Sequence, residues 1–289
     1  MSSPALSELK STLSGEIVSP GEEGYEYGIA RWSDSCSKPA TYVVFPRKAE
    51  DVAAAIKFGR SEGLELAICG GGHSWSGASS TTGLVIHLGK YLNTARCDPE
   101  ERLLYVGGGA LWETGGGSNF GVVTEFVLKA HPQRPNVFVT ILTFPVSKLE
   151  TFVEGVENWF ETVTPDEACA FGFTQGGPQP SPDGPSIQMI YFYNGSPEDG
   201  KKAAEKLYAL GPASEIPFNE LPYVQLNSMM NQASAHGGRK YMKGVTLQPK
   251  LTLETAKALL TMMNESEKGN PGFLYRFHWS RVLSLDEEQ

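Results

Sequence analysis

The stretch Cys69-Gly70-Gly71-Gly72-His73-Ser74-Trp75-Ser76-Gly77 directly follows residues 64–68, a short apolar run that is typical of a β-strand. Three successive glycines let backbone N–H groups approach a bound anion without obstruction by side chains, and such a loop can form a nest for a pyrophosphate. Ser74 and Ser76 add hydroxyl donors, and a neutral imidazole at His73 can act as a nucleophile. A flexible turn with an incidental histidine gives the same local pattern, so the surrounding sequence must decide.

Strand and helix signals alternate around this loop. Residues 41–45, 84–88 and 103–106 are β-branched, aromatic or aliphatic runs, and the last of them leads into Gly107-Gly108-Gly109. Between the first two strands, Glu50-Asp51 opens a segment with apolar residues at helical spacing and acids where the helix dipole favours them. The first 110 residues therefore predict an α+β fold whose strands end in glycine-rich loops.

The second half of the chain predicts another α+β domain, built on an antiparallel sheet. The strands expected from Phe120 onward are residues 122–128, 137–144, 168–173, 187–193, 241–247 and 273–279. Ser147 with Glu150 predicts a capping box, Ser196-Pro197-Glu198-Asp199 predicts an N-cap with proline at N1, and residues 253–263 predict an amphipathic helix without a good cap. Residues 175–185 predict a loop between two strands, such as a long hairpin tip.

Composition excludes several classes of protein. The chain has 289 residues, a net charge of −9 and 40% hydrophobic residues, which indicates a folded acidic protein and disfavours nucleic acid as a partner. No run of 18 apolar residues could span a bilayer, and residues 1–20 lack the apolar core of a secretory signal, so we expect a cytoplasmic chain without a membrane partner. The four cysteines are dispersed, and no metal site is expected.

Signatures of nicotinamide, P-loop, zinc-protease and α/β-hydrolase enzymes are absent from the sequence. Four segments nevertheless occur in the order seen in the vanillyl-alcohol oxidase-type flavoproteins, and the chain resembles their berberine-bridge-like and hydroxynicotine-oxidase-like branch. These segments are Pro39-Ala40-Thr41-Tyr42-Val43-Val44-Phe45-Pro46, Ala49-Glu50-Asp51-Val52-Ala53-Ala54-Ala55-Ile56, Gly70-Gly71-Gly72-His73-Ser74 and Gly115-Gly116-Gly117-Ser118-Asn119-Phe120-Gly121-Val122-Val123-Thr124.

The resemblance implies FAD as the cofactor and a PCMH-type FAD-binding domain at residues 30–132, followed by an α+β substrate-binding domain at residues 133–289. It implies that His73 aligns with the residue that many members bond covalently to the flavin 8α-methyl group. The other residues that it implies for FAD binding are Gly70, Gly71, Gly72, Ser74, Gly77, Asn119, Gly121 and Val123. The implied reaction is hydride transfer from a small alcohol, sugar or alkaloid-like amine to the flavin, with O2 as the acceptor.

Two departures from the family pattern are visible. Only Glu113-Thr114 joins Trp112 to Gly115, where the family has a long stretch with a second glycine-rich FAD motif, and the chain stops at Gln289, before the family's C-terminal segment. The FAD-binding domain is therefore expected to be incomplete and to bind FAD weakly, since each missing hydrogen bond costs about 1 kcal/mol. A skipped exon in the gene model and a real truncated paralogue both explain the gap.

Two alternatives to an FAD-linked oxidase stay open. One is an inactive truncated paralogue that acts as a binding or interaction protein, and the other is a sugar- or alkaloid-binding module without redox chemistry. No catalytic residue is assigned, and the oligomeric state is not predicted. Among the histidines outside the glycine loop, we expect His87 to be a satisfied interior residue and His236 to be a loop residue without a partner.

Overall fold

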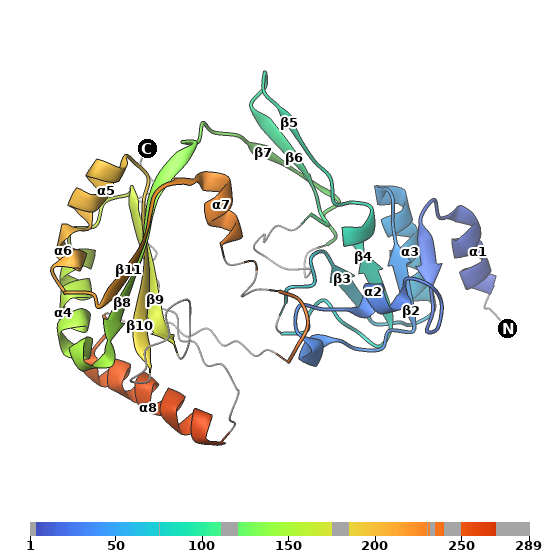
Figure 1. The fold of residues 1–289 in the computed structure, drawn as a ribbon. Coiled ribbons are helices and arrows are strands. Elements are labelled where there is room, and N and C mark those ends of the chain that lie inside the picture. Colours follow the sequence, from blue (N-terminus) through green and yellow to red (C-terminus); the bar gives the residue numbers. More distant parts are fainter. Residues whose placement is uncertain are drawn as a thin grey trace. The chain divides into compact units, whose positions relative to one another are not determined.

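The computed structural model describes residues 4–74, 76–110, 121–174, 185–229, 231, 235–239 and 250–269. The chain divides into two compact units, one comprising Met1–Pro132 with Met230–Gly244 and the other Gln133–Met229 with Val245–Gln289. Each unit combines helices with sheets, so the predicted α+β class is confirmed (Figure 1).

The main sheet of the first unit has four strands in the order β1-β2-β4-β3. These are β1 (Glu16–Val18), β2 (Tyr42–Phe45), β3 (Leu66–Cys69) and β4 (Leu84–His87). β2, β4 and β3 are mutually parallel, and β1 pairs with β2 in the antiparallel sense. The predicted strands at residues 41–45, 64–68 and 84–88 are thus confirmed, and the parallel pairing brings the carboxyl ends of β3 and β4 to one edge.

Both faces of this sheet are covered. Helices α1 (Pro4–Thr12) and α3 (Ala49–Ser61) pack on the face that carries Val44 and Ile86. The other face carries Val43 and Val85 and packs against Tyr25 of the short helix α2 (Tyr25–Ile29). Because side chains alternate along a strand, the unbroken apolar runs predict this burial on two sides.

A second, three-stranded antiparallel sheet completes the first unit. It consists of β5 (Ala95–Asp98), β6 (Leu103–Gly107) and β7 (Glu125–Lys129), in that order. β6 confirms the strand predicted at residues 103–106, and β7 lies at the end of the predicted run 122–128. The position where the sequence departs from the family, between Trp112 and Gly115, lies outside the described residues.

The second unit is built on a fully antiparallel sheet, as predicted, and its strands lie in the order β11-β8-β10-β9. Its strands are β8 (Asn136–Pro145), β9 (Glu167–Thr174), β10 (Ser186–Tyr193) and β11 (Ser214–Pro222). Thr174 pairs with Ser186, so β9 and β10 flank the predicted hairpin loop, whose residues 175–184 lie outside the description. The strands expected at residues 241–247 and 273–279 also lie outside it, and β11 was not predicted.

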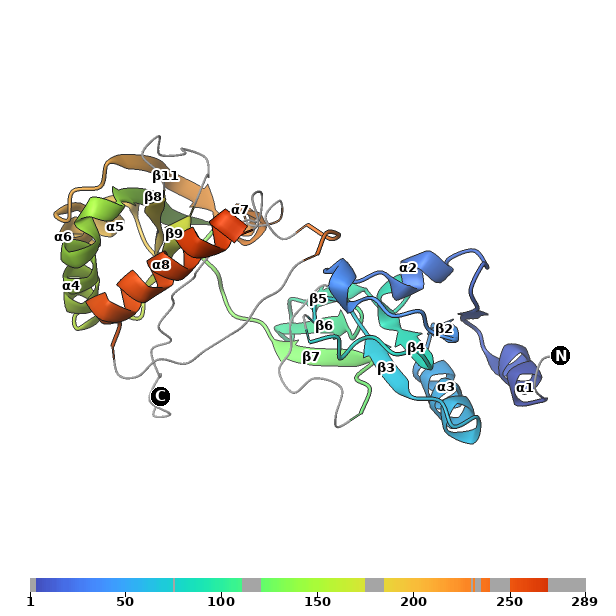
Figure 2. The same ribbon diagram turned by 90° about the horizontal axis from the view of Figure 1, so that it is seen from below.

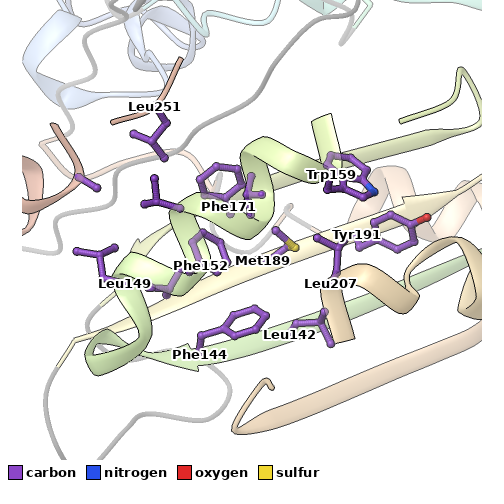
Figure 3. Packing of buried hydrophobic residues seen from close by; sticks show 14 of the residues in the cluster. Leu142, Phe144, Leu149, Phe152, Trp159, Phe171, Met189, Tyr191, Leu207 and Leu251 are labelled. Carbon is purple, nitrogen blue, oxygen red and sulfur yellow. The ribbon is translucent and has the colours of Figure 1, made fainter. Parts of the chain in front are cut away.

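Helices cover one face of this sheet. They are α4 (Leu149–Phe160), α5 (Pro197–Ala203), α6 (Glu205–Tyr208) and α8 (Leu253–Gly269), and α8 lies beside α4 (Figure 2). Phe152 of α4 meets Phe144 and Phe171 edge to face, with ring centroids 5.0 and 5.2 Å apart (Figure 3). The short helix α7 (Tyr223–Ser228) follows β11 directly and contacts it.

The helix starts show which capping predictions hold. Ser196 caps α5 and accepts a hydrogen bond from the Asp199 N–H at 3.1 Å, as predicted. The capping box of Ser147 and Glu150 is wrong, because residues Val146–Lys148 form a 3-10 turn and α4 begins without a side-chain cap. Thr252 supplies the cap that the sequence analysis did not find at α8, since its hydroxyl accepts from the Thr255 N–H at 3.1 Å.

Within the described ranges, no helix is both long and apolar enough to cross a bilayer.

Candidate cofactor-binding site

A cavity of about 570 Å³ lies in the first unit, where three strands end. Its walls include Gly70, Gly71 and Gly72 after β3, Gly89 after β4, and Gly109 and Ala110 after β6. Ligands of sheets with parallel strands commonly bind outside the carboxyl ends of those strands. The volume falls within the range of small-molecule and cofactor sites, about 300–1,000 Å³.

Glycine is required in these walls because the loops touch each other through their backbones. A Cβ atom on Gly89 would lie 2.9 Å from the carbonyl oxygen of Gly70, and one on Gly109 would overlap the carbonyl group of Leu88. Gly72 has φ +69°, a conformation that residues with side chains rarely adopt. The glycine run thus lets three loops converge and leaves their backbone groups as the surface of the cavity.

Among the residues that the structure describes, the rest of the wall carries no carboxylate, although the protein as a whole has a net charge of −9. These remaining wall residues are Tyr27, Ala30, Cys69, His87, Asn93 and His236. Two imidazoles, an amide, a phenol and a thiol therefore supply the polar side chains of the cavity. The described part of the wall, which holds no acid, accepts an anionic ligand at a smaller electrostatic cost than the average surface of this chain would.

Arg31 places a positive charge directly behind this wall. The side chain is 2% exposed and donates from Nη1 to the carbonyl oxygen of the wall residue Ala30 at 2.6 Å. Nε and Nη2 donate to the carbonyl oxygen of Ser79, at 3.1 and 2.6 Å, and Nη1 also reaches Gly28. Burial lowers the pKa of Arg31, but a guanidinium stays charged at neutral pH.

No carboxylate among the described residues forms an ion pair with Arg31. A buried cation without a counter-ion is costly, so an anion bound nearby would improve the balance of charge. The wall and the cation behind it together favour a ligand with phosphate groups.

His87 lies in the wall at the end of β4, between two aromatic rings. Its ring centroid is 5.0 Å from that of Tyr27 and 5.4 Å from that of Phe45. The side chain is 5% exposed, and Nδ1 has no hydrogen-bond partner within the described part of the chain. Burial first, and then the charges of Arg31 and Lys90, lower the pKa of His87 to about 4, so the ring is neutral at neutral pH. The prediction of an interior histidine is confirmed, but the expectation that it is satisfied is wrong.

His73 follows the wall residue Gly72 and lies against Trp32. The two rings are stacked, with centroids 4.6 Å apart and an angle of 28° between their planes. The Trp32 N–H also donates to the carbonyl oxygen of Gly72 at 3.0 Å, which holds the start of the loop in place. The structure therefore positions His73 beside the cavity and not in the wall that its described residues form.

The other residues implied by the resemblance are distributed around the loop. Ser74 and Ser76 join their hydroxyls in a hydrogen bond of 3.0 Å, and Gly77 has φ +75°. Val123 is 46% exposed, and Gly121 is a glycine with φ +148°. Asn119 lies outside the described residues.

A segment far along the chain contributes His236 to the cavity. The Gly237 N–H donates to Trp32 O at 3.2 Å, and the Gly238 N–H donates to Asp34 Oδ2 at 2.8 Å. Sequence reasoning placed His236 in a loop without a partner, and Arg31 and Tyr27 were not singled out at all. No local pattern could have found this arrangement, because 204 residues separate Asp34 from Gly238.

The residues present fit a flavin dinucleotide. Convergent backbone groups and Arg31 suit a pyrophosphate, and the rings of Tyr27 and His87 offer apolar area to a ring system. In the described residues, no group of three or more His, Cys, Asp or Glu side chains could hold a metal ion.

Comparison with known families agrees with this fit. Residues 40–114 match the family described as FAD binding domain. The match spans β2, β3 and β4 and includes the glycine loop of the cavity.

Curated relatives and solved structures agree with this match. The FAD-linked oxidoreductase pgmH of Aspergillus terreus is 26% identical over an alignment that covers 72% of this chain and 57% of that protein. The chain thus spans little more than half the length of this relative. The Acremonium strictum glucooligosaccharide oxidase, whose structure reveals a novel flavinylation, superposes with TM-score 0.71 and 14% identity over 96% of this chain and 74% of that one. The Physcomitrella patens BBE-like 1 structure gives TM-score 0.70 and 16% identity over 90% and 74%.

The predicted resemblance is thereby confirmed: the chain contains a segment that matches an FAD binding domain, in a fold like that of berberine-bridge-like FAD oxidases.

Proposed function

We propose that this protein is an FAD-linked oxidoreductase that oxidises a small organic substrate and passes the electrons to O2. The observation that carries the proposal is the glycine-walled cavity, which has no acid among its described wall residues and has the buried cation Arg31 behind it. The glycine loops of the cavity, at the ends of β3 and β4, lie within the matched residues 40–114, which supports FAD as the ligand.

FAD, when bound, accepts a hydride from a substrate carbon while the substrate releases a proton, and O2 takes up the two electrons with two protons to become H2O2. The chain's own residues supply binding and orientation. In this proposal, Gly70, Gly71, Gly72, Ser74 and Gly77 cradle the pyrophosphate. Asn119, Gly121 and Val123 are proposed to belong to the segment that lines the adenosine and pyrophosphate of FAD.

His73 is the proposed site of a covalent link to the flavin. A bond between a ring nitrogen and the flavin 8α carbon replaces the imidazole N–H bond and one methyl C–H bond, and O2 takes up both hydrogens as H2O2. The stack on Trp32 covers one face of the imidazole and holds the ring next to the glycine loop. The relative with a novel flavinylation supports this assignment by its fold alone.

The substrate class is proposed from the relatives and not from the cavity. A small alcohol, sugar or alkaloid-like amine fits the oxidases to which the chain is similar, and the antiparallel sheet of the second unit is the proposed substrate domain. Cytoplasmic localisation, without a nucleic-acid or membrane partner, remains part of the same proposal.

The purified chain provides the test. We expect added FAD to bind and to show flavin absorption bands, part of which stay with the acid-precipitated protein of the wild type but not of His73→Ala. A panel of alcohols, sugars and amines should then include a compound that bleaches the flavin and releases H2O2. Binding of such a compound to a chain that takes up no flavin would contradict the proposal and favour a binding module. Absence of both activities would favour the inactive paralogue.

A further inference from the structure

His87 is a buried polar side chain in the wall of the cavity. It is 5% exposed, and its Nδ1 has no hydrogen-bond partner in the described ranges. Buried polar groups are nearly always hydrogen-bonded, because an unsatisfied one costs about 1–3 kcal/mol. An exception in the wall of a cavity therefore calls for an explanation.

The described surroundings hold the ring in place without a hydrogen bond to its Nδ1. Tyr27 and Phe45 contact it through their rings, and β4 fixes its backbone in register with Cys69 of β3. On the cavity side stands Gly89, on which a Cβ would lie 3.0 Å from His87 Cε1 and 3.5 Å from Nδ1. The edge of the ring that carries Nδ1 therefore faces a residue whose lack of a side chain leaves room beside it.

Burial and nearby positive charges determine the protonation state of the His87 imidazole. The cations Arg31 and Lys90 both act on His87, and their effect adds to that of burial in favouring the neutral imidazole. A neutral imidazole has one donor and one acceptor nitrogen, so it can bond to either kind of ligand atom. Since an aromatic or aliphatic side chain would fill the same place between Tyr27 and Phe45 without an unsatisfied nitrogen, packing alone does not account for a histidine.

We propose that His87 is a cofactor-binding residue for the flavin dinucleotide, whose polar atoms supply the hydrogen bond that the described residues do not give to Nδ1. The proposal rests on the function proposed above and adds to it a residue in β4, outside the glycine loop. Its consequence is a conflict between stability and binding: the imidazole destabilises the empty protein and strengthens the complex.

The variant His87→Phe separates these effects. Replacing an unsatisfied nitrogen by an apolar ring should raise the melting temperature of the flavin-free protein, whereas its FAD dissociation constant should increase about 3- to 10-fold, as expected for one lost hydrogen bond. Flavin fluorescence quenching measures the dissociation constant without turnover. His131→Phe changes an exposed histidine outside the cavity wall and serves as the matched control, with affinity unchanged.

A parallel loss of melting temperature and affinity would show that His87 is structural, and an unchanged affinity would also overturn the proposal. If His87→Phe does not fold, the wild type gives the answer through ¹⁵N NMR of its imidazoles. FAD should shift the His87 ring resonances, and an absent shift in the flavin-saturated protein counts against the hydrogen bond. A wild type that binds no FAD would instead refute the proposed function, so the two failures are distinguishable.

Discussion

The imidazole of His73 and the indole of Trp32 lie face to face, with ring centroids 4.6 Å apart. The stack restricts the rotation of the imidazole, because turning the ring would break a contact worth about 0.5–1.5 kcal/mol. Trp32 precedes the matched segment 40–114, so a residue outside that segment orients the proposed covalent ligand.

Replacing Trp32 should therefore slow the attachment of flavin. For Trp32→Leu we expect acid-stable flavin to accumulate about 2- to 10-fold more slowly, which corresponds to the loss of the stacking contact. The measurement is the flavin retained in acid-precipitated protein at successive times after FAD is added. Trp32→Phe keeps an aromatic face and should restore most of the rate. Equal rates for Trp32→Leu and the wild type would argue against an orienting role.

Stability should depend on pH through His87. Its pKa is about 4 in the folded protein and about 6.5 in the unfolded chain, so the unfolded state binds the proton first as pH falls. The free energy of unfolding should consequently decrease as pH falls from about 6.5 to about 4, by up to about 3 kcal/mol in total. Well above pH 6.5, His87 is neutral in both the folded and the unfolded state. Its contribution to the free energy of unfolding then no longer changes with pH.

Denaturant titrations between about pH 5 and pH 7 measure this slope before most carboxylates titrate. The His87→Phe variant provides the control, because its curve should be flatter over the same interval. Identical slopes would show that His87 is not the titrating group.

Arg31 should contribute to both folding and ligand binding. Arg31→Met leaves the carbonyl oxygens of Gly28, Ala30 and Ser79 without this donor, and we expect the free energy of unfolding to fall by at least about 3 kcal/mol. Arg31→Lys keeps the charge but loses the planar fork, so stability should be intermediate.

The charge itself is tested by measuring FAD affinity at low and high ionic strength. Binding to the wild type and to Arg31→Lys should weaken with salt, and binding to Arg31→Met should be weaker and less sensitive to salt. If FAD binding to Arg31→Met depended on salt as strongly as binding to the wild type, the charge of Arg31 would not contribute to ligand affinity.

In the second unit, Glu167 is the acceptor for two buried donors. Its Oε2 accepts from Trp159 Nε1 at 3.2 Å and from the Tyr191 hydroxyl at 2.8 Å. Glu167→Ala would leave both donors unsatisfied and should lower the free energy of unfolding by about 2–4 kcal/mol, as measured by denaturant titration. Glu161→Ala breaks only an exposed pair with Lys250 and should cost less than about 1 kcal/mol. Similar losses of unfolding free energy in Glu167→Ala and Glu161→Ala would mean that the two buried hydrogen bonds of Glu167 contribute no more than an exposed ion pair.

The sequence predicted the elements whose signals are local. β2, β3, β4 and β6 are short apolar runs that end at proline or glycine, and α5 has its cap and its N1 proline within four residues. β5 was missed because its residues Ala95, Arg96 and Cys97 are exposed and carry no apolar pattern. β11 was missed because Pro217 and Pro222 disfavour a strand, yet it pairs at the edge of its sheet, where proline is tolerated.

The candidate site also contains residues with a local sequence signal and residues without one. The glycine loop could be found because three glycines and a histidine are adjacent in the sequence. Arg31, Tyr27 and His236 could not, because only the folded chain brings them to the cavity. That the described residues give His87 Nδ1 no hydrogen-bond partner is likewise a property of its three-dimensional surroundings, which periodicity along one strand cannot report.

The hydrogen bonds between Asp34 and Gly238 join an early and a late part of the chain. The cavity can therefore be complete only after the late part has been synthesised. A ribosome makes the strands of the first unit early, but the wall that contains His236 emerges only after most of the second unit has been translated. A nascent chain therefore carries an open pocket for much of its synthesis, and tight loading of the nucleotide has to be a late event.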